Sequence, residues 1–262
     1  MVTKEELREV FLSANIGDGD LIFVHSDASP FLGFGKTGTQ KNMEILKQAF
    51  LEVIGPSGTL IAPTFNYDFC QGKKYIQEET PSQVGLFSNF LLHCPEALRS
   101  FHPIYSAVAF GRQAGDLAKS QSKSSFGNGS LFHWLHEHGA KLVFFNVDFY
   151  YCTFVHYAEQ FTGVDYRFLK HFTGIVSKGG AERSETFDFY ARYLDRDVNL
   201  DLNKLEKDLL AEKQMKKAYL KEEWPVRQVS SDAVFKMILE KLKIEPYYLL
   251  KNPPKLKDLA KS

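Results

Sequence analysis

The stretch KLVFFNVDFYYCTFVHYAE, residues 141–159, decides the fold because a strand, an aromatic loop and a helix follow one another in it. Its apolar start, from Lys141 to Val147, is rich in valine and phenylalanine and predicts a buried strand. Thr153 then stands at or near the N-cap of a short helix that we expect to end at Gly163. Open α/β sheets bind ligands where loops leave the carboxyl ends of strands, so this loop is the first candidate site.

Two side chains of the predicted helix can perform chemistry. His156 and Glu159 are separated by three positions, so they share one face of a helix. His156 lies in the first turn, where the helix dipole disfavours a positive imidazolium. A neutral imidazole can accept a proton, and Glu159 can fix its tautomer. The alternative, on local sequence alone, is a histidine with a local hydrogen bond beside a solvated glutamate.

The chain on either side repeats the alternation of strand and helix, which predicts an α/β fold. We expect a hairpin of strands 172–176 and 184–190 around Lys178-Gly179-Gly180, and C-terminal helices at 203–221 and 229–241. Without an internal repeat or a linker, one domain over residues 1–262 is favoured, and a C-terminal helical subdomain at about 203–262 is left open. The other expected elements are strands 20–25, 59–65 and 107–111 and helices 3–14, 42–53, 86–92 and 131–138.

The strand that ends at His25 is followed by small residues and by Gly33, Gly35 and Gly38. Glycines after a strand let backbone N–H groups approach an anionic or extended ligand. A plain flexible loop fits the same residues. The glycine and lysine spacing of a P-loop is absent.

Composition excludes some classes of function. The chain has 262 residues, 44% of them hydrophobic, so it can bury a large core. Lysine plus arginine and aspartate plus glutamate both number 32, and the formal net charge is zero. That balance argues against nucleic acid, which calls for a basic face, and supplies no acidic field for a polycation.

Three well-separated cysteines, Cys70, Cys94 and Cys152, fit a reducing compartment better than a disulfide framework. The charged N-terminus lacks the apolar region of a signal peptide, and no run reaches the 18 apolar residues of a membrane span. We therefore expect a soluble, cytoplasmic protein, and the sequence does not predict its oligomeric state.

Several segments, in order over about Asp20 to Val176, resemble motifs of the aminoglycoside 3-N-acetyltransferase family. The C-terminal third of the chain matches weakly. The segments are His25–Ser29, Gly58–Phe65, Arg99–Gly111, Ser125–Ser130, Thr153–Glu159 and Tyr166–Lys170.

The resemblance implies an α/β/α sandwich around a mixed, largely parallel sheet, with helical additions at the C-terminus. It also implies transfer of an acetyl group from acetyl-CoA to an amine of a sugar, a small-molecule acceptor, with no metal required. The family's catalytic histidine corresponds to His156, its motif threonine and glutamate to Thr153 and Glu159. A downstream acid that partners the histidine in some members falls near Asp188.

For the cofactor, the resemblance implies that the loop from His25 through Ser26 to Asp27 and the stretch at Ser106 form parts of the coenzyme A groove. The chain departs from the family at two positions, because members usually have serine where it has Asp27 and proline where it has Asp165. Asp27 would add a carboxylate near the cofactor or the amine.

The predicted chemistry is consistent with these residues. An amine attacks a thioester only when neutral, so a base must remove a proton before or during the attack. His156 is the candidate base, and either Glu159 or Asp188 would orient it and stabilise the imidazolium. The Thr153 hydroxyl and backbone N–H groups at the helix start are candidate donors to the tetrahedral oxyanion.

Three other interpretations remain open from the sequence. Cys152, four residues before His156, could form an acyl-enzyme, although free cysteines are often simply buried. A metal hydrolase could use His25, His102, His156 and Glu159, but no HExxH-type spacing supports it. The third is a non-catalytic protein that binds coenzyme A or a sugar.

The acceptor is inferred from charge. Arg167 and Lys170 follow the site helix at a spacing of three, so in a helix they would present two cations on one side. A neutral-to-basic entrance suits an amino sugar that carries phosphate, so a nucleotide-linked amino sugar for surface polysaccharide is the preferred acceptor. The alternative is a polycationic aminoglycoside, as in antibiotic resistance, for which an acidic cleft is expected.

Overall fold

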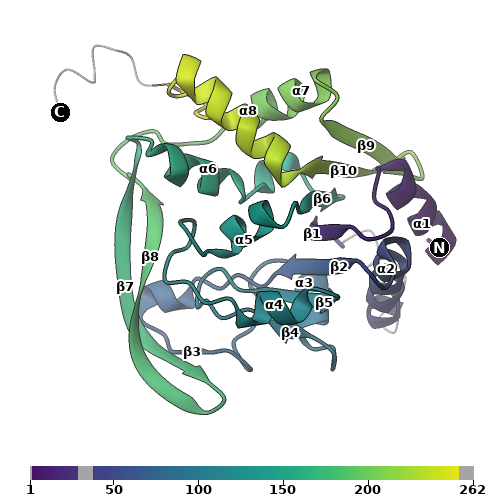
Figure 1. Ribbon diagram of the computed structural model, residues 1–262, viewed down its shortest axis with the longest axis horizontal. Coiled ribbons are helices and arrows are strands. Elements are labelled where there is room, and N and C mark those ends of the chain that lie inside the picture. The colour runs from purple at the N-terminus through teal and green to yellow at the C-terminus, as the bar shows by residue number, and fades with distance from the viewer. Residues whose placement is uncertain (1, 29–37, 254–262) are drawn as a thin grey trace.

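A mixed sheet of seven strands forms the centre of the computed structural model, which describes residues 2–28 and 38–253 (Figure 1). β1 pairs in parallel with β2 and β6, and the remaining neighbours pair antiparallel. The α/β class is thus confirmed, with parallel pairing confined to the three central strands. The order is β4 (Leu98–Arg99), β5 (Ala107–Gly111), β2 (Thr59–Pro63), β1 (Leu21–Ser26), β6 (Lys141–Phe145), β10 (Trp224–Ser230) and β9 (Met215–Leu220).

Helices cover both faces of this sheet, so the α/β/α sandwich is confirmed. Along β1, Ile22 and Val24 join the core beneath one layer, whereas Leu21 and Phe23 join the core beneath the other. Because both faces are buried, the central strands are nearly continuous apolar runs. The first layer holds α1 (Lys4–Ser13), α2 (Gly38–Ile54) and α3 (Leu86–Leu92); the second holds α4 (Ala114–Lys119), α5 (Leu131–Glu137), α6 (Val155–Thr162), α7 (Asn203–Ala211) and α8 (Ser231–Ile244).

A long hairpin runs along one side of the molecule, beside the helices of the second layer (Figure 1). Its strands, β7 (Arg167–Lys178) and β8 (Ala181–Arg192), extend well beyond the predicted ranges, and β3 (Tyr75–Ile76) pairs in parallel with β7. The two turn residues, Gly179 and Gly180, both have positive φ, as a type I′ hairpin turn requires. The hairpin places residues far apart in sequence next to α6.

The C-terminal region differs from the prediction, because the helix expected at 203–221 ends at Ala211. Residues 215–220 and 224–230 form β9 and β10 instead, and β10 pairs with β6 in the central sheet. Pairing with a buried strand outweighs the local helix preference of this lysine-rich stretch, as strand formation depends on its neighbours. α7 and α8 also contribute buried residues to the second-layer core. Whether residues from about 203 onward form a separate subdomain or part of a single domain stays a prediction.

The ends of two helices show what sequence patterns can locate. The capping box of α1 forms as expected, with Glu6 N donating to Thr3 Oγ1 at 3.1 Å and Thr3 N donating to Glu6 Oε2 at 2.8 Å. α6 ends at Gly163 as expected, and Thr153, expected at or near the N-cap, directly precedes it. A short 3₁₀ helix, η3 (Phe149–Tyr151), precedes α6, and Phe154 occupies the cap position without a side-chain bond.

Some predicted features fall outside the described residues, namely the loop with Gly33 and Gly35 and the end of the chain from Pro254. None of the helices in the described ranges is both long and apolar enough to cross a membrane.

Candidate active site

The site is centred on a histidine and a glutamate of α6. His156 Nδ1 lies 2.5 Å from Glu159 Oε2, as their spacing of three on a helix predicts. Glu159 is fully buried, whereas the His156 side chain is 21% exposed. The Phe126 ring packs edge-on against the imidazole with centroids 5.1 Å apart. The histidine is therefore fixed on one edge and open on the other.

Electrostatics favour a neutral His156 beside a charged Glu159. Burial lowers the pKa of His156, Glu159 raises it and Arg167 lowers it again, so the net pKa lies below its ordinary value. Burial raises the pKa of Glu159, but His156 and Arg167 outweigh burial and the net pKa is lowered. A carboxylate only accepts hydrogen bonds, so Nδ1 of the neutral imidazole carries the proton and Nε2 keeps a lone pair.

Arg167 is placed differently from the prediction. It is the first residue of β7, and its Nε lies 2.7 Å from Glu159 Oε2, with only 7% of the side chain exposed. Lys170 lies on the same strand with its Nζ 4.9 Å from the centre of the Phe172 ring. The premise of a helical pair is wrong, because both residues lie on strand β7. Arg167 is also already paired with Glu159.

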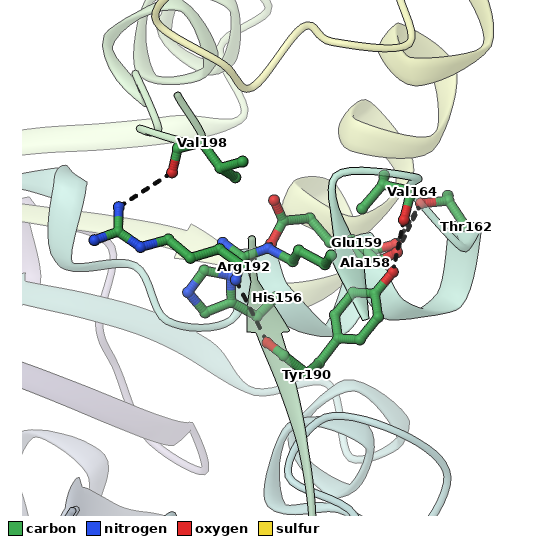
Figure 2. Close-up of polar contacts among 9 residues, drawn as sticks. His156, Ala158, Glu159, Thr162, Val164, Tyr190, Arg192 and Val198 are labelled. Atoms are coloured by element: carbon green, nitrogen blue, oxygen red, sulfur yellow. Dashed lines mark hydrogen bonds and ion pairs between the residues drawn. The ribbon is translucent and has the colours of Figure 1, made fainter. Parts of the chain in front are cut away.

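His156 opens onto a cavity of about 760 Å³ between α6, the hairpin and the segment that follows β8. Figure 2 shows His156 and Glu159 near Tyr190 and Arg192, which lie on β8. Tyr190 OH donates to Val164 O at 3.0 Å, and Arg192 Nη1 donates to Val198 O at 3.2 Å. Charged side chains in the lining include Arg167, Lys170, Arg192 and Asp195.

A second cavity, of about 580 Å³, adjoins the carboxyl ends of β1 and β2. Its lining contains three predicted cofactor-binding residues, His25, Ser26 and Asp27, together with Thr153. His25 Nε2 and Ser26 Oγ are buried and have no hydrogen-bond partner within the described part of the chain. Burial lowers the pKa of His25 to about 4, so the ring is neutral. Both atoms therefore have hydrogen-bonding capacity that the described part of the protein does not use.

The segment between β6 and α6 contributes to both cavities. Tyr150 lines the first cavity and Tyr151 the second, and both side chains are more than half exposed. Thr153 Oγ1 donates to Tyr151 O at 3.3 Å, and the N–H groups of Val155, His156 and Tyr157 bond carbonyls three residues back. The proposed role of Thr153 and of these N–H groups at an oxyanion stays a prediction.

Two predicted site residues lie away from this centre. Ser106 is buried in a network with Thr64 and Arg99 and is not among the residues lining the cavity that holds Ser26. Asp188 Oδ1 lies 2.7 Å from His171 Nδ1, the residue directly opposite it in the hairpin, so it is Glu159 that contacts His156. Side chains directly opposite one another in an antiparallel pair are close enough to interact, which explains why Asp188 bonds His171.

The alternative centres do not assemble. Cys152 is 1% exposed, and burial raises its pKa to about 12, so the thiolate needed for an acyl-enzyme is suppressed. None of the three cysteines, all of which lie in the described residues, forms a disulfide bond. Among the described residues, no group of three or more histidine, cysteine, aspartate or glutamate side chains is arranged to hold a metal ion.

Sequence reasoning missed several residues around the open edge of His156. Tyr150, Phe189, Arg192 and Asp195 line its cavity, and the last three come from β8 and the segment after it. For Tyr150, the sequence offered a local signal, namely two adjacent tyrosines in the loop before the site helix. The others depend on how far the hairpin extends, which no local pattern indicated.

Comparisons with known proteins agree with this architecture. Residues 23–243 match the family model described as aminoglycoside 3-N-acetyltransferase. A curated relative, aminoglycoside N(3)-acetyltransferase III of Serratia marcescens, is 28% identical over 178 residues, which is 61% of this chain and 64% of that protein. The match therefore spans less than two thirds of that relative's length.

Two solved structures share the fold at low identity. AAC-IIIb, as a binary complex with CoASH, has a TM-score of 0.77 at 19% identity, covering 97% of this chain and 99% of that one. A mutant of aminoglycoside acetyltransferase AAC(3)-IVa in complex with a gentamicin has a TM-score of 0.76 at 19% identity, covering 96% of this chain and 92% of that one.

These findings correct the expected acceptor. The preference for a nucleotide-linked amino sugar is wrong, because the family description and the named relatives all concern aminoglycosides. Its structural premise fails too, since Arg167 is paired with Glu159. The family model covers most of the sequence, from strand β1 to helix α8. The chain belongs to the aminoglycoside 3-N-acetyltransferase family.

Proposed function

We propose that this protein transfers the acetyl group of acetyl-CoA to an amine of an aminoglycoside, with His156 as the general base. The observation that carries the proposal is the His156–Glu159 pair at the wall of a cavity. Family membership and the names of the relatives support the donor and the acceptor class.

The residues of α6 account for the proton transfer. His156 Nε2 takes the proton that the amine nitrogen loses as its bond to the acetyl carbon forms, and returns a proton to the sulfur when the carbon–sulfur bond breaks. Glu159 holds Nδ1–H and stabilises the imidazolium that exists between these two events. Because His156 is neutral before the reaction, it is ready to accept the proton.

The second cavity fits the arm of the donor. Acetyl-CoA supplies an activated acetyl thioester at the end of a chain that contains uncharged amides. The unpaired His25 Nε2 and Ser26 Oγ can bond such amides, because neither side chain is charged. Gly85, with φ +79°, also lines this cavity and brings a bare backbone to it. The donor side is thus assigned to His25 and Ser26, and the acceptor side to the cavity at His156.

The loop between the cavities separates donor from acceptor. Its residues Tyr150 and Tyr151 face opposite cavities, with Thr153 on the donor side and His156 on the acceptor side. Two substrates that approach from the two sides would meet at this loop, where the base stands. Holding both reactants in place accounts for a large share of such a rate enhancement.

The test is an acceptor screen with release of free thiol as the readout. The wild-type protein is incubated with acetyl-CoA and gentamicin or sisomicin, and the products are identified by mass spectrometry. A sugar with hydroxyl groups but no amine is the matched control acceptor. We expect thiol release only with the amines, and one acetylated amine in the product.

The same screen distinguishes an acetyltransferase from a non-catalytic binding protein. Binding of coenzyme A without acetyl transfer to any aminoglycoside would contradict the proposal and support a non-catalytic binding protein. Thiol release that does not depend on an amine would indicate hydrolysis of the thioester instead.

A further inference from the structure

One carboxylate oxygen of the site is shared by two nitrogen groups. Glu159 Oε2 lies 2.5 Å from His156 Nδ1 and 2.7 Å from Arg167 Nε. Glu159 is fully buried and Arg167 nearly so. The arginine comes from β7 and the other two residues from α6, so the contact joins the hairpin to the site helix.

The charge balance of this cluster changes when His156 is protonated. With a neutral imidazole, the charges of Glu159 and Arg167 cancel. A proton on His156 would leave one uncompensated positive charge in a largely buried group of three, which is costly in a low-dielectric setting. Without Arg167, the same proton would instead complete an ion pair with Glu159. The arginine therefore opposes protonation of the histidine.

The other groups that face His156 do not reverse this balance. Tyr166 and Tyr190 lie beside Glu159; burial and the carboxylate raise both pKa values, that of Tyr190 to about 12, so they stay neutral. The cavity adds Lys170, Arg192 and Asp195, a net excess of one positive charge. Within the described residues, Glu159 is the carboxylate in contact with the imidazole.

We propose that Arg167 is a positioning residue, which holds Glu159 charged and in place and so keeps His156 neutral and aimed at the acceptor amine. The proposal rests on the proposed function for its catalytic consequence, but not for its geometry. It replaces the expected role of Arg167 as a binder of substrate phosphate. A role through Glu159 predicts changes in kcat and in the pH profile, whereas substrate contact predicts a change in KM.

The kinetic test compares Arg167→Gln and Arg167→Met with the wild-type protein. Both remove the charge, and glutamine keeps an N–H group for Glu159. We expect the acidic limb of the kcat/KM profile to move to higher pH by about one unit or more, because a nearby cation is lost. Arg167→Lys should restore much of the wild-type profile while kcat stays reduced, since lysine lacks the rigid fork of arginine.

A matched control lies on the same hairpin. Arg183 pairs with Glu185, Nε to Oε1 at 2.7 Å, away from the residues that line the cavity at His156. Arg183→Met removes an arginine–glutamate pair without touching the site, so the pH profile should not move. Any general weakening of the hairpin would appear in this variant as well.

A second readout does not depend on acetyl transfer. The pKa of the His156 imidazole is measured by NMR on histidine-labelled protein without substrates. It should lie below the ordinary 6.5 in the wild type and rise by about one unit or more in Arg167→Gln. A wild-type pKa at or above 6.5, or superimposable titrations of the two proteins, would overturn the proposal. Absence of acetyl transfer alone would refute only the proposed function.

Discussion

At the scale of the residue, the chemistry of His156 depends on which groups the Glu159 carboxylate contacts. Glu159 orients the imidazole through Nδ1, and the pair is local because both residues lie on one helical turn. Arg167 completes the group from another element, so it was not predictable from spacing along the chain. Arg167 is paired with Glu159 of α6, and Asp188 is paired with His171 across the hairpin, so neither lies where the sequence predicted.

Cys152 supplies a prediction at this scale. Its thiol is buried with a pKa raised to about 12, so Cys152→Ala should keep most of the activity, with sequential kinetics and a stability loss of about 1 kcal/mol. Cys70→Ala, which removes a half-buried thiol elsewhere, is the matched control. Ping-pong kinetics or an acetyl label trapped on Cys152 would show that catalysis is covalent.

At the scale of the element, buried strands and capped helices were predictable because their patterns are local. β1, β2 and β6 are short apolar runs, and α1 carries its capping box in the sequence. β9 was missed because Met215 to Leu220 is buried only at its ends and is rich in lysine. β9 forms a strand because it pairs with β10, which in turn pairs with β6. Thr153 was expected at or near the N-cap of α6, and the cap lies one residue later, at Phe154, after the turn of η3.

The hairpin turn gives a prediction for an element. A Cβ added at Gly180 meets no atom within 4 Å, but φ is +77°. Substitution there should therefore be limited by backbone strain alone. Gly180→Asn should be tolerated, whereas Gly180→Val should lower the free energy of unfolding by about 1–2 kcal/mol relative to asparagine. Equal stability of the two variants in urea unfolding would show that the turn does not hold this conformation in solution.

At the scale of the whole molecule, two buried histidines should set the response to acid. Burial lowers the pKa of His25 to about 4 and that of His102 to about 3, against an ordinary 6.5. Between 6.5 and these values the unfolded chain binds protons that the folded protein does not. Stability is therefore fully present above pH 6.5 and falls as the pH drops through this window, by about 1.4 kcal/mol per histidine for each pH unit.

His102→Asn tests this acid response, because it removes the buried ring away from the site. His102 Nδ1 accepts from Ile104 N and Tyr105 N, and an asparagine oxygen can accept from the same groups. Urea unfolding between pH 7 and pH 4 should show a smaller loss of stability in the variant than in the wild type. If the free energy of unfolding falls equally in the two proteins between pH 7 and pH 4, His102 does not contribute to the acid response.

The fold brings a cavity at the ends of β1 and β2, proposed for the donor, and a cavity under the hairpin, proposed for the acceptor, to the two sides of one loop. The first was predictable, because ligands bind at the carboxyl ends of such strands. The second depends on the course of β8 and of the segment after it, far from α6 in the sequence. The central claim is that His156, placed between them, removes the proton from the amine.

The most direct test is the activity of His156→Asn, measured together with its affinity for coenzyme A by calorimetry. The cavity proposed for the donor is lined by His25 and Ser26 rather than by His156, so the affinity should stay within about twofold of the wild type. We predict that kcat for acetyl transfer to an aminoglycoside falls by about 10²–10⁴, the usual contribution of a general base. A loss of less than about threefold, with normal binding of coenzyme A, would contradict the assignment of His156 as the base.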